Sequence, residues 1–352
     1  MHQRYRSVLP QQLQLGLASF ARSLDRGVAD PADVSSLTAM IGALPPGEIA
    51  PAMAHIATAA GLHGHAPVRI VEGGSWWTLF TGPRHVRNDA ELLAETTNLE
   101  YLFLFHRSGY LREAALNKLD GALPGAFYVA AITYRLNDWV PQVRHAARDC
   151  LSRVKKMTDP DVLAAAGLAL LARTESWRRW RDEADAFDEV VADPNVAHRL
   201  ACAIGESVVG PMGQTLRSAL RRSDIDAHLP ELLRSPRQPS VRAIALKVLL
   251  DAKARWPSGT EKKWIDKSLG RYRMEPAWRE RPLERAVPVE KLLEIGARDP
   301  AASVRKVAAS GLVAHFDMVP TARALACRLL HDRNRTVREC AQFALDRAGR
   351  KG

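Results

Sequence analysis

Two stretches near the end of the chain carry one pattern: Asp299-Pro-Ala-Ala-Ser-Val-Arg305-Lys-Val-Ala308-Ala-Ser-Gly-Leu312 and Asp332-Arg-Asn-Arg-Thr-Val-Arg338-Glu-Cys-Ala341-Gln-Phe-Ala-Leu345. In each, a Val-Arg pair follows the Asp, and an Ala and a Leu follow the Arg at fixed spacing. The Val, Ala and Leu stand at positions i, i+4 and i+8, so they form one apolar stripe on a helix. The two arginines are 33 residues apart, a spacing typical of helical repeat arrays.

Further copies of the pattern occur earlier in the chain. Residues 138–151 match it in full, and residues 109–119 and 236–249 match it in part. The Asp193-Pro194 pair with Arg199 keeps only the spacing from Asp to Arg, and we interpret it as a degenerate copy. From residue 90 onward, the sequence therefore predicts pairs of helices at intervals of about 33 residues.

The N-terminal part differs from the rest. Residues 1–65 lack the Val-Arg pattern, and residues 1–89 are predicted to form a helical cap module with an irregular segment. Within it, residues 67–81 form two short extended runs around Gly73-Gly74, so a small β-hairpin is possible there. The repeat array is predicted over residues 90–352. A basic, aromatic insertion at about 255–285 interrupts it, and its Pro and Gly residues favour a loop.

The repeated pattern resembles the second helices of the HEAT-repeat family, over roughly residues 90–350. The resemblance implies an all-α fold, a HEAT-like α-solenoid of stacked antiparallel helix pairs with the helical module at its start. It also implies that Asp and Arg side chains form a ladder between stacked repeats. The expected members of this ladder are Asp138, Arg144, Asp299, Arg305, Asp332 and Arg338.

Composition narrows the class of protein. Hydrophobic residues make up 47% of the chain but aromatic residues only 6%, which suits closely packed helices. No run of 18 apolar residues predicts a membrane span, and four scattered cysteines suit the cytoplasm. The net charge is +11, yet residues 1–100 hold 7 basic and 9 acidic side chains. The positive charge of the remainder could attract an acidic partner, or reflect a general preference for arginine.

The insertion is the best candidate for a binding site. It combines cations, which contact phosphates or carboxylates, with aromatic rings, which stack on nucleobases. Alternatively, its tryptophans anchor the insertion while its charges face water. The candidate partner- or polyanion-binding residues are Lys262, Lys263, Trp264, Lys267, Arg271, Arg273, Trp278 and Arg279.

Catalysis is not predicted. The sequence shows no Gly-rich phosphate loop and no Ser-His-Asp set. Ser75-Trp76-Trp77 resembles a tryptophan pair of the alkylpurine DNA glycosylases, in which an Asp that assists base excision follows the pair. Thr78 stands in that place here, so no catalytic residue carries over. The His63-Gly-His65 pair has no Cys or carboxylate cluster to complete a metal site, and no cofactor is expected.

The expected function is therefore that of a non-catalytic scaffold or adaptor in the cytoplasm. Its concave face would bind a macromolecule, in the first place a protein with an acidic surface. The alternative is a nucleic-acid-binding HEAT-like protein with a glycosylase-like architecture. Neither a membrane nor a small-molecule substrate is expected as a partner.

Overall fold

A computed structural model describes residues 9–63, 88–173, 177 and 183–349. This part of the chain is mostly helical and contains eighteen α-helices and one two-stranded antiparallel sheet. The helical fold class is confirmed. The predicted loop at 255–285 is wrong, because the sheet lies there. The hairpin predicted at 67–81 falls outside the described residues.

Contacts divide the chain into two compact units, which are residues 1–170 with 176–190, and residues 171–175 with 191–352. The division predicted at residue 89 stays a prediction. No described helix is long and apolar enough to cross a membrane. The first unit contains α1 (Gln11–Leu24), α2 (Pro31–Gly42), η1 (Pro46–Glu48), α3 (Ile49–Ala59), α4 (Asp89–Glu95), α5 (Leu99–Phe103), α6 (Gly109–Lys118), α7 (Ala126–Arg135), α8 (Pro141–Val154) and α9 (Pro160–Leu170), and also α10 (Ala184–Val191) up to Val190.

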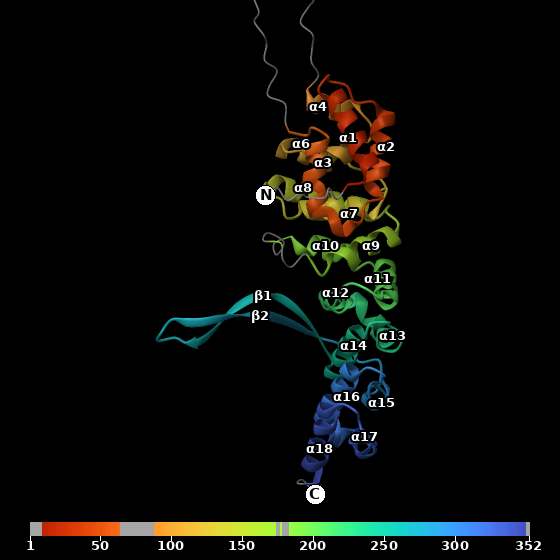
Figure 1. The fold of residues 1–352 in the computed structure, drawn as a ribbon, viewed down its shortest axis with the longest axis vertical. Coiled ribbons are helices and arrows are strands. Elements are labelled where there is room, and N and C mark those ends of the chain that lie inside the picture. Colours follow the sequence, from red (N-terminus) through yellow and green to blue (C-terminus); the bar gives the residue numbers. More distant parts are fainter. Residues whose placement is uncertain (1–8, 64–87, 174–176, 178–182, 350–352) are drawn as a thin grey trace, which may run out of the picture. The chain divides into compact units, whose positions relative to one another are not determined.

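In the first unit, neighbouring helices pack in two rows. Helix α6 packs against α8, and α7 packs against α9, while α7 also contacts α8 (Figure 1). The predicted apolar stripe of α8 is confirmed, because Val143, Ala147 and Leu151 are all buried. Helices α1, α2 and α3 pack against one another.

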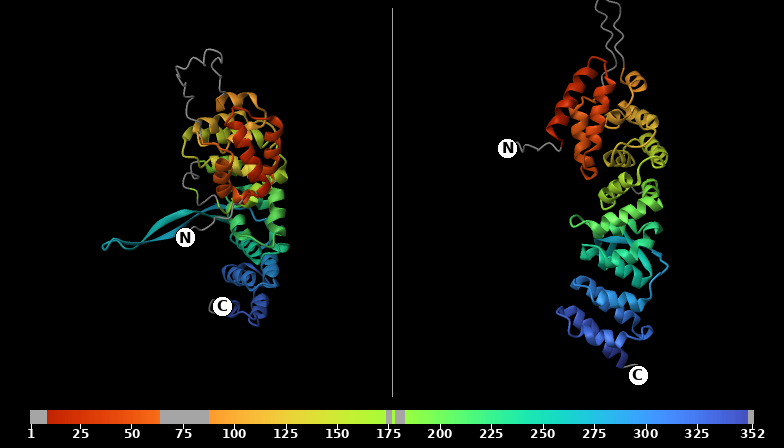
Figure 2. Two further views of the ribbon diagram at one scale, coloured as in Figure 1. Left: turned by 45° about the horizontal axis from the view of Figure 1, so that its top comes forward. Right: turned by 90° about the vertical axis from the view of Figure 1, so that its right-hand side faces the viewer.

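The second unit begins with α11 (Pro194–Glu206) and α12 (Met212–Ala219). It continues with η5 (Ser223–His228), α13 (Leu229–Arg234), α14 (Pro239–Asp251), β1 (Lys253–Asp266), β2 (Arg271–Pro282), α15 (Val289–Ala297), α16 (Ala302–His315), η6 (Phe316–Met318), α17 (Ala322–Leu329) and α18 (Arg335–Gly349). Helices α12, α14, α16 and α18 form one row in which each contacts the next. Helices α13, α15 and α17 pack against the sides of α14, α16 and α18 (Figure 2).

Small residues allow these helices to approach closely. A Cβ atom on Gly296 of α15 would lie 2.4 Å from the side chain of Leu246 and 2.9 Å from Cβ of Ala308. The apolar stripe of Val304, Ala308 and Leu312 in α16 is buried as predicted. In α18, Val337 and Ala341 are buried as predicted, whereas Leu345 is only half-buried.

One copy of the pattern was wrongly interpreted. The segment that begins at Asp193-Pro194 was predicted to be the second helix of a degenerate pair, but its helix, α11, packs against η5. The helix that joins the row of α14 is α12, which has no Val-Arg pair. Asp193 caps α11, accepting hydrogen bonds from the N–H groups of Asn195 and Val196, as an Asp does at the start of many helices.

Arginines of the pattern bind carboxylates that belong to the next copy. Arg242 makes a two-pronged contact with Asp299, with nitrogen–oxygen distances of 2.7 and 3.0 Å. Arg305 binds Asp332 in the same way, at 2.6 and 3.0 Å. In the first unit, Arg112 binds Asp138 at 2.9 and 2.8 Å. Each of these arginines also donates to carbonyl oxygens of its own loop, such as that of Pro236 for Arg242.

The other two predicted ladder arginines make no such two-pronged pair with an Asp in the part of the chain that the structure describes. Arg144 donates to the carbonyl of Asp138 at 3.0 Å and lies 3.5 Å from Glu183. Arg338, on the last helix, donates to the carbonyls of Asp332 and Arg333. The carboxylates of Asp138, Asp299 and Asp332 each accept a backbone N–H two residues later, which fixes the turn before the next helix.

Candidate functional site

The insertion forms a long antiparallel hairpin, which we call the arm (residues 253–282). Figure 1 and Figure 2 show it leaving the helices of the second unit and extending away from them. Strand pairing runs from Lys253 opposite Pro282 to Asp266 opposite Arg271. A bulge places Ser258 and Gly259 opposite one residue of β2, which increases the twist of such a ribbon.

Only the base of the arm is held by the helices. Helix α14 ends at Asp251, and the left-handed backbone of its C-cap residue Ala252 (φ 51°) turns the chain into β1. Ala254 is fully buried. Arg281 of β2 binds both oxygens of Asp226 at 2.7 Å and donates to the carbonyls of Leu220 and Arg222. These contacts fix the direction in which the arm leaves the unit.

One face of the arm combines aromatic rings and cations. Cross-strand pairing places Trp264 opposite Tyr272, and Lys262 opposite Met274, on the same side of the ribbon. The two rings meet edge to face at 5.5 Å between centroids, and the Lys262 ammonium lies 4.6 Å from the centre of the Tyr272 ring. Because the bulge opposes two residues to one, Arg255 and Trp278 nearer the base lie on this same face. We call it the aromatic face.

Large apolar side chains on the arm are exposed to solvent. Trp264 is 47% exposed, Tyr272 46% and Met274 52%. At the tip, Ile265 and Leu269 are about two-thirds exposed, at 68% and 64%. Exposed apolar groups gathered on one element are typical of an interaction surface.

The opposite face of the arm is partly neutralised. Glu275 lies 3.1 Å from Lys263 and also pairs with Arg273. The hydrogen bond from Lys263, with further help from Arg273, lowers the pKa of the Glu275 carboxyl. These cations therefore share one carboxylate, whereas Lys262 contacts a ring.

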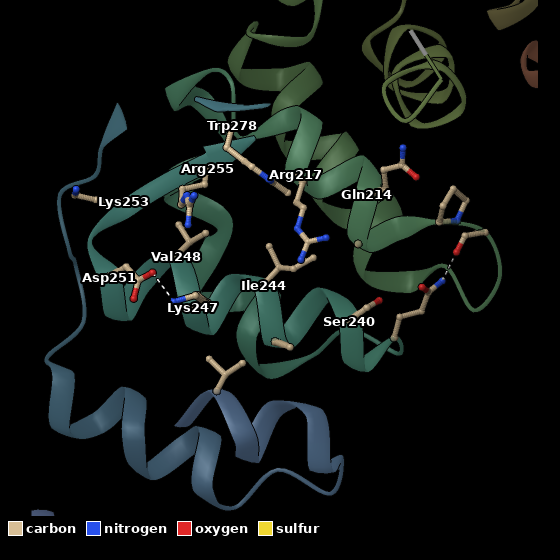
Figure 3. Close-up of a pocket in the computed structure, with 16 residues that line it drawn as sticks. Gln214, Arg217, Ser240, Ile244, Lys247, Val248, Asp251, Lys253, Arg255 and Trp278 are labelled. Atoms are coloured by element: carbon tan, nitrogen blue, oxygen red, sulfur yellow. Dashed lines mark hydrogen bonds and ion pairs between the residues drawn. The ribbon is translucent and has the colours of Figure 1, made fainter. Parts of the chain in front are cut away.

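At the base of the arm, the aromatic face borders a groove of about 680 Å³ between α12, α14 and the strands (Figure 3). The Trp278 ring lies at its edge, with the guanidinium carbons of Arg217 and Arg255 5.8 and 5.7 Å from the ring centre. Ile244 and Val248 of α14 supply an apolar wall. Each arginine is within the range of a cation–π contact, so the groove is both apolar and positively charged.

The other charges of the groove are paired. Lys247 binds Asp251 at 2.7 Å, and Lys253 at the start of β1 binds Glu280 at 2.8 Å. Arg255 lies 3.8 Å from Glu280. Arg217 has no carboxylate partner among the described residues. Its guanidinium is therefore the group in the groove best placed to bind an anion.

Net charge is concentrated in the second unit. Residues 191–352 hold 30 basic and 18 acidic side chains, whereas residues 1–190 hold 20 and 21. The arm alone has nine basic and four acidic residues. A unit of this charge attracts polyanions over a distance set by the salt concentration.

All eight candidate residues from the sequence lie on the arm, but the structure divides them. Lys262 and Trp264 lie on the aromatic face, Trp278 borders the groove, and Lys267 lies at the tip. Lys263, Arg271, Arg273 and Arg279 lie on the opposite face by their register. Sequence reasoning missed Arg255 and Tyr272, although the same insertion contains them. It gave no signal for Arg217 or Lys247, which are ordinary surface positions of helices until the arm passes beside them.

No group of three or more His, Cys, Asp or Glu side chains in the described part of the chain is arranged to hold a metal ion. The nearest approach to a reactive cluster is on α11, where Cys202 lies 3.8 Å from His198, and the His198 ring lies 5.3 Å from that of His228. Burial, with the neighbouring His198, lowers the pKa of His228.

Comparison with known proteins gives no family: no family model and no curated protein matches the chain.

Proposed function

We propose that this protein is a non-catalytic HEAT-like α-solenoid scaffold that binds nucleic acid through the arm and the groove at its base. The observation that carries the proposal is the aromatic face, on which exposed rings and cations alternate along a ribbon that leaves the helical body. Cations contact phosphates and aromatic rings stack on bases, so one surface offers both of the contacts by which proteins bind single-stranded nucleic acid.

Three further features support the proposal. The second unit carries all of the excess positive charge. Arginine dominates that charge, and its planar guanidinium suits phosphate oxygens. The row of α12, α14, α16 and α18, tied by Arg–Asp pairs between successive copies, supports a repeat scaffold.

The test is fluorescence anisotropy with labelled 20-nucleotide single strands and duplexes at 50 mM salt. The variant Lys262→Glu/Lys267→Glu reverses two exposed cations of the arm that have no carboxylate partner among the described residues. We expect it to weaken binding at least tenfold, because it replaces attraction to phosphates by repulsion. Absence of binding by the unaltered protein at this salt would contradict the proposal.

A matched control makes the same change of charge elsewhere. Arg22 and Lys156 are exposed residues of the first unit, whose charge is balanced. The variant Arg22→Glu/Lys156→Glu is expected to bind within about twofold of the unaltered protein. If both variants lose affinity equally, the loss is caused by the change in the net charge of the protein and not by the changes in the arm.

A protein with an acidic surface is the second candidate, and the exposed tip residues Ile265 and Leu269 favour it. Apolar contacts resist salt, whereas phosphate contacts weaken steeply as salt rises. A partner retained at 500 mM salt and lost in the variant Ile265→Ser/Leu269→Ser would support this candidate.

A further inference from the structure

The groove at the base of the arm has the features of a ligand site. Its volume of about 680 Å³ falls within the range of small-molecule sites. One wall is apolar, and polar side chains such as Gln214 and Ser240 lie at the end away from Trp278 (Figure 3). An apolar wall with a few polar groups is the usual composition of a site that accepts a planar ring.

Trp278 supplies a surface for stacking. Its side chain is 43% exposed although two arginines lie beside it. A ring that served only to anchor the arm would be covered by the helices, as Ala254 is. The guanidinium carbons of both arginines lie over the ring, at 5.8 and 5.7 Å from its centre. They add positive charge next to the exposed part of the ring, which suits a ligand that is aromatic and anionic at once.

Arg217 supplies the place for the anion. It projects from α12 into the groove (Figure 3), and its guanidinium has no carboxylate partner in the described ranges. Lys247 lies on the neighbouring helix, with its charge matched by Asp251. One guanidinium without a carboxylate partner among the described residues, next to one exposed indole, fits a single phosphate joined to a single base.

We propose that this groove binds an unstacked nucleotide of a single strand, with the base against Trp278 and a phosphate at Arg217. The inference rests on the proposed function and makes it specific. In a duplex, each base is stacked between its neighbours and is not free to enter the groove. The strand then continues along the aromatic face to Tyr272, about 20 Å away for six strand residues, where further bases stack.

The experiment compares the unaltered protein with Trp278→Ala and Trp278→Phe, using labelled single strands, duplexes and single strands that contain abasic sites. We expect Trp278→Ala to lower affinity for the single strand about tenfold and to leave duplex binding unchanged. Trp278→Phe should retain most of the affinity, because it keeps a ring. The abasic strand should bind the unaltered protein about as weakly as the intact strand binds Trp278→Ala.

The matched control is Trp139→Ala, which removes an indole that is 70% exposed in the first unit. Its affinity for every strand should equal that of the unaltered protein. Circular dichroism and melting temperature show whether each variant is folded. Quenching of tryptophan fluorescence by the single strand should fall in Trp278→Ala but not in Trp139→Ala.

The outcomes separate this inference from the proposed function. If single strands and duplexes bind equally and Trp278→Ala binds both normally, the groove inference is overturned. The proposed function then stands, provided that Lys262→Glu/Lys267→Glu still loses affinity. If no strand binds at 50 mM salt, both are overturned.

Discussion

The Arg–Asp pairs between successive copies are the residues on which the helical packing most depends. Arg242 and Asp299 are both mainly buried, with 11% and 7% of their side chains exposed. The pair joins α14 to the loop before α16. A buried charge is stable only while its partner remains.

We expect Asp299→Ala to lower the free energy of unfolding by about 3–5 kcal/mol, because it leaves the Arg242 guanidinium buried without a counter-charge. Urea unfolding followed by circular dichroism measures the change. The control is Glu339→Ala, which removes one partner of the exposed pair with Arg335 and should cost less than about 1 kcal/mol. Equal losses for the two variants would contradict this account of the buried pair.

Asp138 gives the first unit a dependence on pH. Burial by itself raises the pKa of its carboxyl, but hydrogen bonds from Arg112 and the Val140 N–H, together with the charges of Arg135 and Arg112, outweigh burial and hold the pKa below its ordinary value. A lowered pKa means that the folded state favours the carboxylate. The resulting stability is fully present above the unfolded pKa, near 3.9, and is lost as pH falls through the folded pKa.

The variant Asp138→Asn should therefore be less stable than the unaltered protein at pH 7, and the difference should shrink below about pH 4. Other carboxylates also titrate in this range, so the quantity to follow is the difference between the two proteins. Urea unfolding at pH 7, 5, 4 and 3 measures it. A difference that stays constant across these pH values would show that the charge of Asp138 is not the cause.

At the scale of elements, the arm differs from the helices around it. Its outer part is exposed on both faces, and its anchoring contacts, Ala254 and the Arg281–Asp226 pair, lie at the base. The arm thus adds little buried area to the second unit. Its exposed rings and cations are therefore the groups to which we assign the proposed binding role.

Shortening the arm should separate these roles. Glu261 and Glu275 are paired across the strands, so replacing residues 262–274 by Asn-Gly keeps the base, including Trp278 and Arg281, and closes the ribbon with a tight turn. We expect the melting temperature to change by no more than about 3 °C, and affinity for single strands to fall at least tenfold. A large loss of stability would show that the outer arm supports the fold.

At the scale of the whole molecule, the charge is divided between a balanced first unit and a strongly basic second unit. The pattern of charge matters more for binding than the net value of +11, since the excess lies in the unit that carries the arm. Long-range attraction of a polyanion is then directed to that unit.

The salt dependence of binding should reveal this charge. If about five cations contact phosphates of a single strand, the logarithm of the affinity falls against the logarithm of salt with a slope of about −3.5. Between 50 and 200 mM salt, the affinity should therefore fall about a hundredfold. Anisotropy titrations at four salt concentrations measure the slope. A slope near zero would indicate that apolar contacts dominate, as in the second candidate function.

The sequence predicted the candidate residues of the arm but not the site that they form. Lys262, Trp264 and Trp278 were identified from composition alone, because cations mixed with rings stand out in a chain that is 6% aromatic. The insertion was nevertheless interpreted as a loop, since its Pro and Gly residues are turn formers. In the hairpin, Gly259 belongs to the bulge and Gly270 to the tip turn, and both have the positive φ that glycine adopts easily. Turn-forming residues at these two places are therefore compatible with a hairpin.

The sequence by itself determined the helical class and the buried stripes of α8, α14 and α16. The periodic spacing of Val, Ala and Leu lies within a single helix, so it can be read without knowing which helix packs against it. The tertiary structure decided which Asp each Arg binds, which helix joins the row of α14, and how Arg217 comes to lie beside Trp278. Those contacts join residues 26 to 61 positions apart. No local pattern encodes them, since they arise only when helices pack and the arm is anchored across them.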